Sequence, residues 1–383
     1  MQNIIHPIPL SLYIHIPWCV KKCPYCDFNS HNLKTAIPET DYINALITDL
    51  QQDLQQLPIM GREIHSVFIG GGTPSLLSPD SVAKLLEEIQ KHLRFTKEIE
   101  ITLEANPGTV EQLKFQGFRE AGINRLSIGI QSFNSDKLKA LGRIHDGQEA
   151  IKAVEAAQWA GFTNFNLDLM YGLPQQNVAE TIYDLETALT LNPTHLSWYQ
   201  LTLEANTAFY HHPPPLPTDD VLWEMQLAGQ AFLASRGFHP YEISAYSHDL
   251  PSQHNLNYWH FGDYLGIGAG AHGKITDLSN HTITRTWKTK HPKAYLDAAT
   301  PFITGQKNLS REEIPLEFML NALRLYQPIA LDLFTQRSGL QIDAVLTQLK
   351  TARARGLLDF DDSMMVTTDL GKRYLNDLLQ IFL

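Results

Sequence analysis

The sequence predicts an α/β protein whose larger part is a partial (β/α)6 barrel and whose smaller C-terminal part is mainly helical. Three observations support this fold class. Apolar, strand-like runs alternate with helical stretches over the first two thirds of the chain, polar or glycine-rich residues directly follow several of those runs, and the pattern changes to helices at about residue 310. Strands separated by helices form βαβ units around a parallel sheet. About six units predict an open or partial barrel rather than a complete one with eight.

Each unit is expected from its apolar spacing and from the turn residues that bound it. The predicted strands are Leu12–Ile16, Ser66–Ile69, Glu98–Leu103, Arg125–Ile130, Asn164–Met170 and His195–Leu201. The predicted helices between them are Tyr42–Leu57, Ser81–Leu93, Val110–Ala121, Gln148–Ala160 and Ala179–Leu191. The polar signatures follow the strands at the carboxyl edge of the sheet, where such folds place their sites.

Consecutive prolines at Pro213–Pro215 mark a break, because proline continues neither a helix nor a central strand. The sequence therefore predicts a barrel over residues 1–212, an extension that closes it over 213–309, and a separate C-terminal domain over 310–383. Within the extension we expect a helix at Asp219–Ser235 and a strand at Tyr241–Tyr246.

Two further segments are interpreted from their local pattern. The glycine-rich run Leu265–Gly273 lacks the strand–turn–helix context of a dinucleotide site, so we expect a strand and a tight turn that close the sheet. In the C-terminal domain, Gly356–Phe360 and Met364–Thr367 are expected to form a small hairpin before a helix at Asp369–Leu379. That layout resembles a winged helix.

Charge and hydropathy exclude several classes of protein. The net charge is -11 over 383 residues, which argues against broad nucleic-acid binding because a basic surface is needed there. No apolar run approaches the roughly 20 residues that span a bilayer. The first seven residues lack the basic and then apolar build of a signal peptide. We therefore expect a cytoplasmic protein with no transmembrane segment.

All three cysteines of the chain, Cys19, Cys23 and Cys26, fall in one CxxxCxxC motif. An odd number so crowded is a poor disulfide framework, so metal or cluster ligation is the better interpretation. Such spacing suits a [4Fe–4S] cluster in which each thiolate binds a different iron. With no fourth cysteine, one iron would be open to an exchangeable ligand. A zinc site completed by a histidine is the alternative, although zinc sites usually have two separated pairs of ligands.

Polar side chains follow the later predicted strands as well. Gly70–Thr73 follows the second strand, Glu104 the third and Gln131 the fourth, while Asp168 lies near the end of the fifth. Any one of them could be an ordinary solvated loop residue. Converging on the mouth of one barrel, they could bind the charged and hydroxyl groups of a buried polar ligand.

The motif and its surroundings resemble the radical S-adenosylmethionine superfamily. The segments Tyr13–Pro17, Cys23–Ser30, Gly70–Ser75 and Tyr171–Pro174 are similar to those of the oxygen-independent coproporphyrinogen oxidase family. Within that family the chain is most similar to a branch of heme chaperones. The resemblance implies a radical S-adenosylmethionine barrel with a [4Fe–4S] cluster on the three cysteines, S-adenosylmethionine at the open iron, and an electron donor. The partners it implies are heme as cargo and the apoproteins that receive it.

The resemblance also implies a set of residues that contact S-adenosylmethionine. They are Tyr13, Tyr25, Gly71, Gly72, Thr73, Glu104, Gln131, Arg143 and Asp168. Among these, Tyr25 is expected to pack beside the adenine.

The oxidase branch remains the alternative function. It would decarboxylate coproporphyrinogen III oxidatively through a 5′-deoxyadenosyl radical. The residues after Cys26 are Asp27 and Phe28, where the oxidases carry Gly-Cys, and little sequence precedes the first strand. Gln253–Trp259 instead contains the HNxxYW signature of the chaperone branch. His254 in that signature is a candidate for heme contact, although a lone histidine is more often structural.

Overall fold

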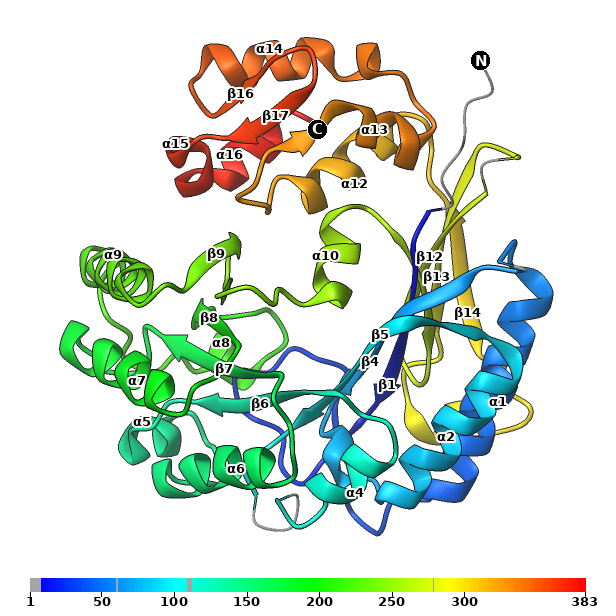
Figure 1. The fold of residues 1–383 in the computed structure, drawn as a ribbon, viewed down its shortest axis with the longest axis vertical. Helices are drawn as coiled ribbons and strands as arrows, with labels where there is room; N and C mark the ends of the chain where they lie inside the picture. Colours follow the sequence, from blue (N-terminus) through cyan, green and yellow to red (C-terminus); the bar gives the residue numbers. More distant parts are fainter. Residues whose placement is uncertain (1–7, 60, 109–111, 278) are drawn as a thin grey trace.

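The computed structural model describes residues 8–59, 61–108, 112–277 and 279–383. Its main feature is a sheet of twelve strands in the order β14-β13-β12-β11-β1-β4-β5-β6-β7-β8-β10-β9 (Figure 1). The central strands run parallel and are β1 (Leu10–Ile16), β4 (Glu63–Gly71), β5 (Arg94–Ala105), β6 (Arg125–Gln131), β7 (Phe165–Tyr171) and β8 (His195–Gln200). These six strands confirm the predicted partial (β/α)6 barrel.

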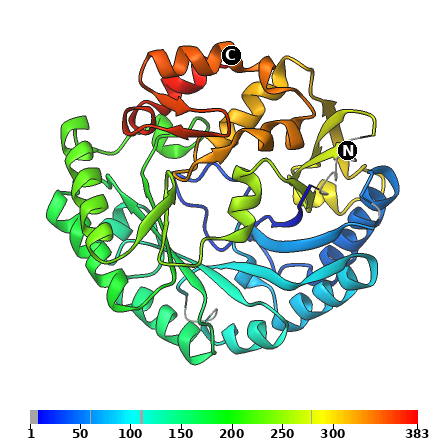
Figure 2. The same cartoon turned by 45° about the horizontal axis from the view of Figure 1, so that its top comes forward.

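Helices follow the central strands and cover the outside of the sheet (Figure 2). They are α1 (Glu39–Gln56), α2 (Pro79–His92), α4 (Phe115–Glu120), α5 (Ser135–Ala140), α6 (Gly147–Trp159) and α7 (Val178–Thr190), with a short 3-10 turn at Pro74–Leu76. Local sequence fixes where several of them begin. A capping box opens α6 at Asp146 and Glu149, and another opens α7 at Asn177 and Glu180.

The predicted helices differ from the observed ones mainly in the connections. Helix α5 was not predicted, because its six residues are too few to show a periodic apolar face. The helix expected at Val110–Ala121 is described only as α4, and its first two residues lie outside the described part of the chain.

The sheet extends beyond the barrel at both edges. On one side β11 (Asp263–Ile267) runs parallel to β1 and is followed by the antiparallel strands β12 (His272–Asp277), β13 (Thr282–Lys288) and β14 (Ile303–Asn308). The glycine-rich run therefore supplies the strand and turn that were expected. On the other side lie β10 (Ala245–Ser247) and β9 (His239–Glu242).

The strand predicted at Tyr241–Tyr246 is in fact two antiparallel strands, β9 and β10. The backbone N–H of Ser244 and its hydroxyl both donate to the Glu242 carboxylate, at 3.1 and 2.8 Å. These local bonds stabilise a turn between the two strands, because a side chain that satisfies nearby backbone groups competes with a continuous strand.

Further strands and helices complete the larger part of the fold. Strands β2 (Trp18–Cys19) and β3 (His31–Asn32) form a separate pair, and the helices are α8 (Ala208–His211), α9 (Asp219–Ser235), α10 (Gln253–Trp259) and α11 (Pro292–Tyr295). Helix α9 has the predicted bounds. Within the described ranges, no helix is both long and apolar enough to cross a membrane.

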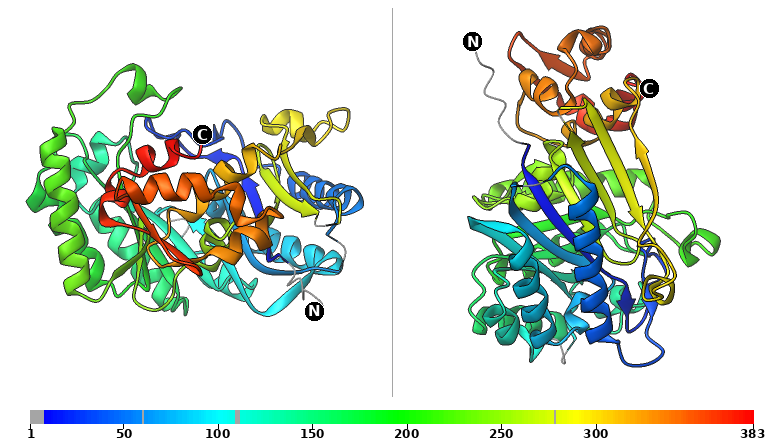
Figure 3. Two further views of the ribbon diagram at one scale, coloured as in Figure 1. Left: turned by 90° about the horizontal axis from the view of Figure 1, so that it is seen from above. Right: turned by 90° about the vertical axis from the view of Figure 1, so that its right-hand side faces the viewer.

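The C-terminal domain lies beside α10, at the end of the sheet away from the arrowhead of β1 (Figures 1 and 3). Its helices are α12 (Glu313–Ala322), α13 (Leu331–Ser338), α14 (Leu346–Ala354), α15 (Asp369–Arg373) and α16 (Leu375–Gln380), with a 3-10 turn at Ile342–Ala344. The predicted hairpin is present as β16 (Leu358–Phe360) and β17 (Met364–Thr367), and β15 (Ile329–Ala330) pairs with β17.

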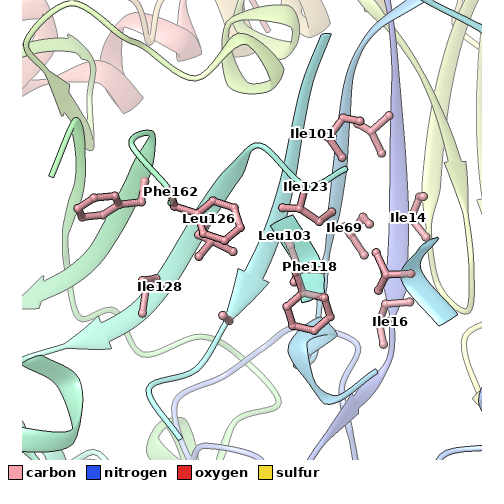
Figure 4. Close-up of a cluster of buried hydrophobic side chains, with 14 of the residues drawn as sticks. Ile14, Ile16, Ile69, Ile101, Leu103, Phe118, Ile123, Leu126, Ile128 and Phe162 are labelled. Carbon is pink, nitrogen blue, oxygen red and sulfur yellow. The ribbon is translucent and has the colours of Figure 1, made fainter. Parts of the chain in front are cut away.

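Two large apolar cores hold these parts together, and the described residues form a smaller third cluster as well. The first runs along the outer face of the sheet, and Figure 4 shows Ile14, Ile69, Leu103 and Leu126 meeting there from four neighbouring strands. The second core belongs to the C-terminal domain and also takes in Phe261 from the extension. Side chains alternate along a strand, so the residues between the buried apolar ones face the interior of the barrel. The three-part division of the chain remains a prediction.

Candidate functional site

A cavity of about 330 Å³ opens at the carboxyl ends of the central strands, inside the partial barrel. Cys19, Cys23 and Cys26 all line it. Eight of the nine residues predicted to contact the cofactor line it too: Tyr25, Gly71, Gly72, Thr73, Glu104, Gln131, Arg143 and Asp168. We call this space the cysteine cavity. Its volume is at the lower end of the range for small-ligand sites, about 300–1,000 Å³.

Backbone hydrogen bonds hold the start of the cysteine loop in place. Strand β2 pairs in parallel with β3, and the backbone N–H of Leu33 donates to the carbonyl of Cys19 at 2.9 Å. The N–H of Cys26 donates to the carbonyl of Cys23 at 3.1 Å, which turns the loop. A loop closed in this way presents its three thiols from one short segment.

The chemistry of these thiols fits a positively charged iron group. Burial raises the pKa of Cys19 and of Cys26, so that without a cation nearby both would stay protonated. Metal binding reverses this preference, because the thiolate is the ligand. Among the residues that the structure describes, no three His, Cys, Asp or Glu side chains gather as ligands of one metal ion. Three thiolates that each bind a separate iron of a cubane need not converge in that way.

The glycine loop after β4 lies against the cysteine loop. Gly71 has φ +116°, a conformation that favours glycine, and its N–H donates to the Glu104 carboxylate at 2.9 Å. A Cβ on Gly72 would collide with the backbone carbonyl of Trp18. Thr73 accepts a hydrogen bond from Asn106 at 2.9 Å. Glycine at 72 lets the two loops approach this closely, and glycine at 71 leaves room for the ring of His15.

Two carboxylates face the cysteine cavity without a cation in contact. In the described part of the chain Glu104 and Asp168 form no salt bridge; Asp168 accepts bonds from Ser127 at 3.0 Å and Asn166 at 2.8 Å. Burial and then the nearby Asp168 raise the pKa of Glu104 to about 7, and burial also raises the pKa of Asp168. A cationic ligand would relieve both effects, because an opposite charge favours the ionised form.

Arg143 supplies positive charge at the cysteine side of the same cavity. Its Nη2 donates to Asn106 at 2.8 Å and to the carbonyl of Gly129 at 2.7 Å, and its Nη1 lies 3.6 Å from the sulfur of Cys23. Its buried Nε has no partner among the described residues. A buried donor left without a partner is costly, so this nitrogen favours an anionic or polar ligand.

Gln131 is held in a strained conformation at the end of β6. Its φ is +69°, and a register shift in the pairing of β6 with β7 lies at this residue. The Tyr199 hydroxyl donates to its side-chain oxygen at 3.1 Å. Strain of this kind persists where the surroundings fix it, often at functional sites.

Tyr13 is the one predicted contact that does not line the cavity. Its hydroxyl donates to Nδ1 of His15 at 2.9 Å, and its ring lies 6.3 Å from that of Phe68. The carboxylate of Glu104 is close enough to raise its pKa, after burial. Its role as a cofactor contact stays a prediction.

The HNxxYW signature lies on α10, which presents different residues to different surroundings. Asn255 and Trp259 line the cysteine cavity. His254 is 1% exposed, and its two ring nitrogens are bonded to Ser66 and Tyr258, both at 3.0 Å. Burial lowers its pKa to about 3. To bind iron, His254 would first have to give up one of these bonds.

Other lining residues were missed by reasoning from the sequence. They include Asn106, Ser127, Ser197, Tyr199 and Glu242. Ser127, Ser197 and Tyr199 alternate with buried apolar residues on β6 and β8, so extending the strand-end rule to inward-facing positions would have found them. Glu242 lines the cavity from the end of β9, beside the turn that was predicted as part of one continuous strand. No local sequence signal indicated that it belongs to the site.

Comparison with known proteins gives matches over nearly the whole chain. The Radical SAM superfamily matches residues 13–223, and the HemN C-terminal domain matches 309–374. The chain is 52% identical to the heme chaperone HemW of Haemophilus influenzae and 48% identical to that of Escherichia coli K12, over 98% of each chain. Among solved structures, coproporphyrinogen III oxidase (HemN) from Escherichia coli matches with a TM-score of 0.82 at 23% identity, covering 98% of this chain and 90% of that one.

Proposed function

The chain belongs to the radical SAM superfamily and, within it, to the HemW family, and from this premise we propose that it is a heme chaperone. It binds heme and passes it to apoproteins. The observation that carries the proposal is the identity of 52% over 98% of both chains with a relative that has this name. The likeness to the oxidase HemN concerns the fold alone, since that identity is 23%.

The cofactors of the superfamily are a [4Fe–4S] cluster and S-adenosylmethionine, and the cysteine cavity fits both. We assign the cluster to Cys19, Cys23 and Cys26, which leaves one iron without a protein ligand. When bound, the two cofactors supply one-electron chemistry at a sulfonium.

The remaining lining residues orient and neutralise S-adenosylmethionine in this proposal. The carboxylates of Glu104 and Asp168 hold its positive charge, and the backbone at Gly71 and Gly72 lets it approach closely. Arg143, whose Nε has no partner among the described residues, faces the carboxylate of S-adenosylmethionine. Tyr25 belongs to the same set of contacts, as do Thr73, Gln131 and Tyr13.

Three further points belong to the proposal. We expect an electron donor for the cluster, and a cytoplasmic location, because three crowded free thiols need a reducing compartment. We also keep His254 as a candidate heme contact, with the structural role of its two ring bonds as the competing explanation.

Heme titration tests the proposal directly. Full-length protein, reconstituted anaerobically with iron and sulfide, would be titrated with heme and followed by visible absorbance. We expect stoichiometric uptake, and then transfer to a heme-free cytochrome, seen as growth of the absorbance of the acceptor. Absence of stoichiometric uptake would contradict the chaperone function.

A genetic control separates the chaperone from the oxidase. The gene would be expressed in a strain that lacks anaerobic heme synthesis, next to a coproporphyrinogen oxidase as the positive control. We expect no rescue. Growth without added heme would support the oxidase alternative instead.

A further inference from the structure

A large groove lies between the barrel and the C-terminal domain, at the amino ends of the central strands. Its volume is about 1280 Å³. Its walls come from the start of β4 and β5, from α10 and from α13, and among the residues that line it are Arg62, His65, Leu256, Leu333 and Arg337. We call it the interdomain groove. It is separate from the cysteine cavity, and α10 contributes residues to both.

The sizes of the two spaces indicate where a cargo could be held. The cysteine cavity, at about 330 Å³, is already required for the cluster and S-adenosylmethionine. A tetrapyrrole is a third large group, and typical ligand sites have about 300–1,000 Å³ for a single ligand. The interdomain groove, at about 1280 Å³, has room that the cysteine cavity lacks.

The residues that line the groove and the buried charged groups behind them carry more positive than negative charge. Asp263 is fully buried and accepts from Arg62 at 2.9 Å and from Lys274 at 2.9 Å. Arg337 faces the same carboxylate, and the neighbouring Arg62 helps to lower its pKa, after burial. Three cations thus surround one carboxylate, an excess of two charges. The acidic residues on the groove, Glu63 and Asp332, are both exposed.

Arg337 is the cation most available to a ligand. It makes no hydrogen bond or salt bridge with the described residues, and its buried Nε has no partner among them. A guanidinium matches the geometry of a carboxylate with two parallel bonds. Two carboxylates, such as the propionates of heme, would balance the excess of charge around Asp263.

His65 is aimed by an irregularity in the sheet. The register between β1 and β4 passes from Leu10↔Ile64 to Ser11↔Ser66, so His65 is an extra, bulged residue. Bulges redirect a side chain and are common next to functional sites. The ring Nδ1 of His65 lies 2.9 Å from the carbonyl of Leu10 and must donate to it.

That bond selects the tautomer that binds iron. With the proton on Nδ1, the lone pair of Nε2 is free, and Nε2 makes no hydrogen bond with the described residues. Burial lowers the pKa of His65, which favours the neutral ring. A backbone carbonyl that orients an imidazole is the usual support of a metal-ligating histidine. Leu256 and Leu333 add apolar surface to the groove on opposite sides, from α10 and α13.

From this arrangement we propose that heme is carried in the interdomain groove, with Nε2 of His65 as its axial ligand and with Arg337 and Arg62 facing its propionates. The inference rests on the proposed function, since it takes heme as the cargo. It assigns the cargo and the cofactors to opposite ends of the same strands.

A second surface groove, of about 1170 Å³, is a weaker candidate. It contains His31 and His291, but Nδ1 of His291 accepts from the N–H of Lys293 at 3.2 Å, which leaves the proton on Nε2. His31 has its Nε2 next to the side chain of Asn29 at 3.3 Å. The cations that line this second groove include Lys22 and Lys34, whose ammonium groups lack the two parallel N–H donors of an arginine guanidinium.

Spectroscopic titration of the reconstituted full-length protein tests the assignment. In His65→Ala we expect a shifted Soret band and heme affinity weaker by about tenfold or more, and added imidazole should restore the wild-type spectrum. In Arg337→Gln we expect about tenfold weaker affinity, for heme and for iron-free protoporphyrin alike. The dimethyl ester of heme, which lacks the carboxylates, should bind wild type and Arg337→Gln equally.

Matched controls come from elsewhere on the chain. His291→Ala removes a histidine of the second groove, and Arg355→Gln removes an exposed arginine of the same C-terminal domain; both should bind heme as wild type does. Each variant would first be checked for its cluster absorbance. If wild type binds no heme, the proposed function fails. If wild type binds heme but His65→Ala and Arg337→Gln leave the spectrum and affinity unchanged, the groove assignment is wrong, and a Soret shift in His254→Ala or His291→Ala alone would also overturn it.

Discussion

Two of the regions in which this protein buries charge do so in opposite ways. At the sheet extension the ammonium of Lys288 is fully buried and lies 2.6 Å from Asp49 and 2.6 Å from Asp53. Asp49 also accepts from the Tyr295 hydroxyl at 2.7 Å. In the cysteine cavity, by contrast, the carboxylate of Glu104 has only the backbone N–H of Gly71 as its partner among the described residues, at 2.9 Å.

The difference separates structural from functional charge. A buried charge is costly unless it is paired, so the lysine–aspartate network (Lys288, Asp49 and Asp53) can be explained by the fold alone. Even there, burial and the second carboxylate raise the pKa of Asp53 to about 6, despite Lys288. In the cysteine cavity, Glu104 and Asp168 have no paired cation among the described residues, whereas Glu242 is paired with Arg324 at 3.0 Å. The fold alone therefore does not explain the carboxylates of Glu104 and Asp168. They are best explained by a cationic ligand.

The largest expected effect comes from the cysteines. Replacing Cys19, Cys23 and Cys26 by serine should abolish cluster binding, because the thiolates are its ligands. Iron and sulfide in anaerobically reconstituted protein should fall to background. The free energy of unfolding of the cluster-free protein should change by less than about 1 kcal/mol, because serine is close to cysteine in size and the three cysteines lie outside the apolar cores. Retention of a full complement of iron would contradict the assignment.

The second largest expected effect is a loss of stability when the lysine–aspartate network is disrupted. Lys288→Met removes the cation and leaves two buried carboxylates facing each other, which should cost about 3–5 kcal/mol of unfolding free energy at pH 7. Chemical denaturation measures it. The matched variant is Glu104→Gln, which should be neutral or slightly stabilising because it removes an unpaired charge. Equal losses of unfolding free energy in Lys288→Met and Glu104→Gln would contradict the distinction between the two regions.

A smaller effect is expected on cofactor affinity. Glu104→Gln should weaken binding of S-adenosylmethionine by roughly 10- to 100-fold, since a charge-assisted hydrogen bond contributes about 1.5–3 kcal/mol. Isothermal titration under anaerobic conditions measures the dissociation constant. Glu100→Gln is a control in the barrel, because that carboxylate binds the start of α10 and does not line the cavity. The affinity of Glu100→Gln for S-adenosylmethionine should stay within a few-fold of that of the wild type.

The smallest effect is a dependence on pH. The pKa of Glu104 is raised to about 7 in the ligand-free protein, and a cationic ligand would lower it. Below pH 7 the ligand must displace a proton, so its affinity should fall by up to tenfold per pH unit, whereas above pH 7 it should be level. Glu104→Gln should flatten this profile. An unchanged slope in the variant would assign the dependence to another group.

Local patterns allowed most of the fold to be predicted. Alternation of apolar runs and helices predicted the six central units. The pairing of β11 with β1 could not be predicted, because it joins segments about 250 residues apart by backbone bonds that carry no sequence signature. The split between β9 and β10 depends on how the Glu242 side chain bonds to Ser244, which periodicity does not reveal.

The candidate site was predicted in part for similar reasons. Residues at strand ends, such as Glu104 and Asp168, were identified because the carboxyl ends of parallel strands meet at one edge. The position of His254 was not, since its bonds to Ser66 and Tyr258 depend on how α10 packs on the sheet. Nor did any motif indicate His65, whose direction depends on a bulge.

The most direct test of the central claim, that the three thiols hold a cluster open to S-adenosylmethionine, is electron paramagnetic resonance of the reduced, anaerobic protein with and without that nucleotide. We predict a [4Fe–4S]⁺ signal in the wild type that changes when S-adenosylmethionine is added, because the nucleotide binds the iron that lacks a cysteine. A spectrum that ignores the nucleotide, or protein that contains zinc in place of iron, would contradict it.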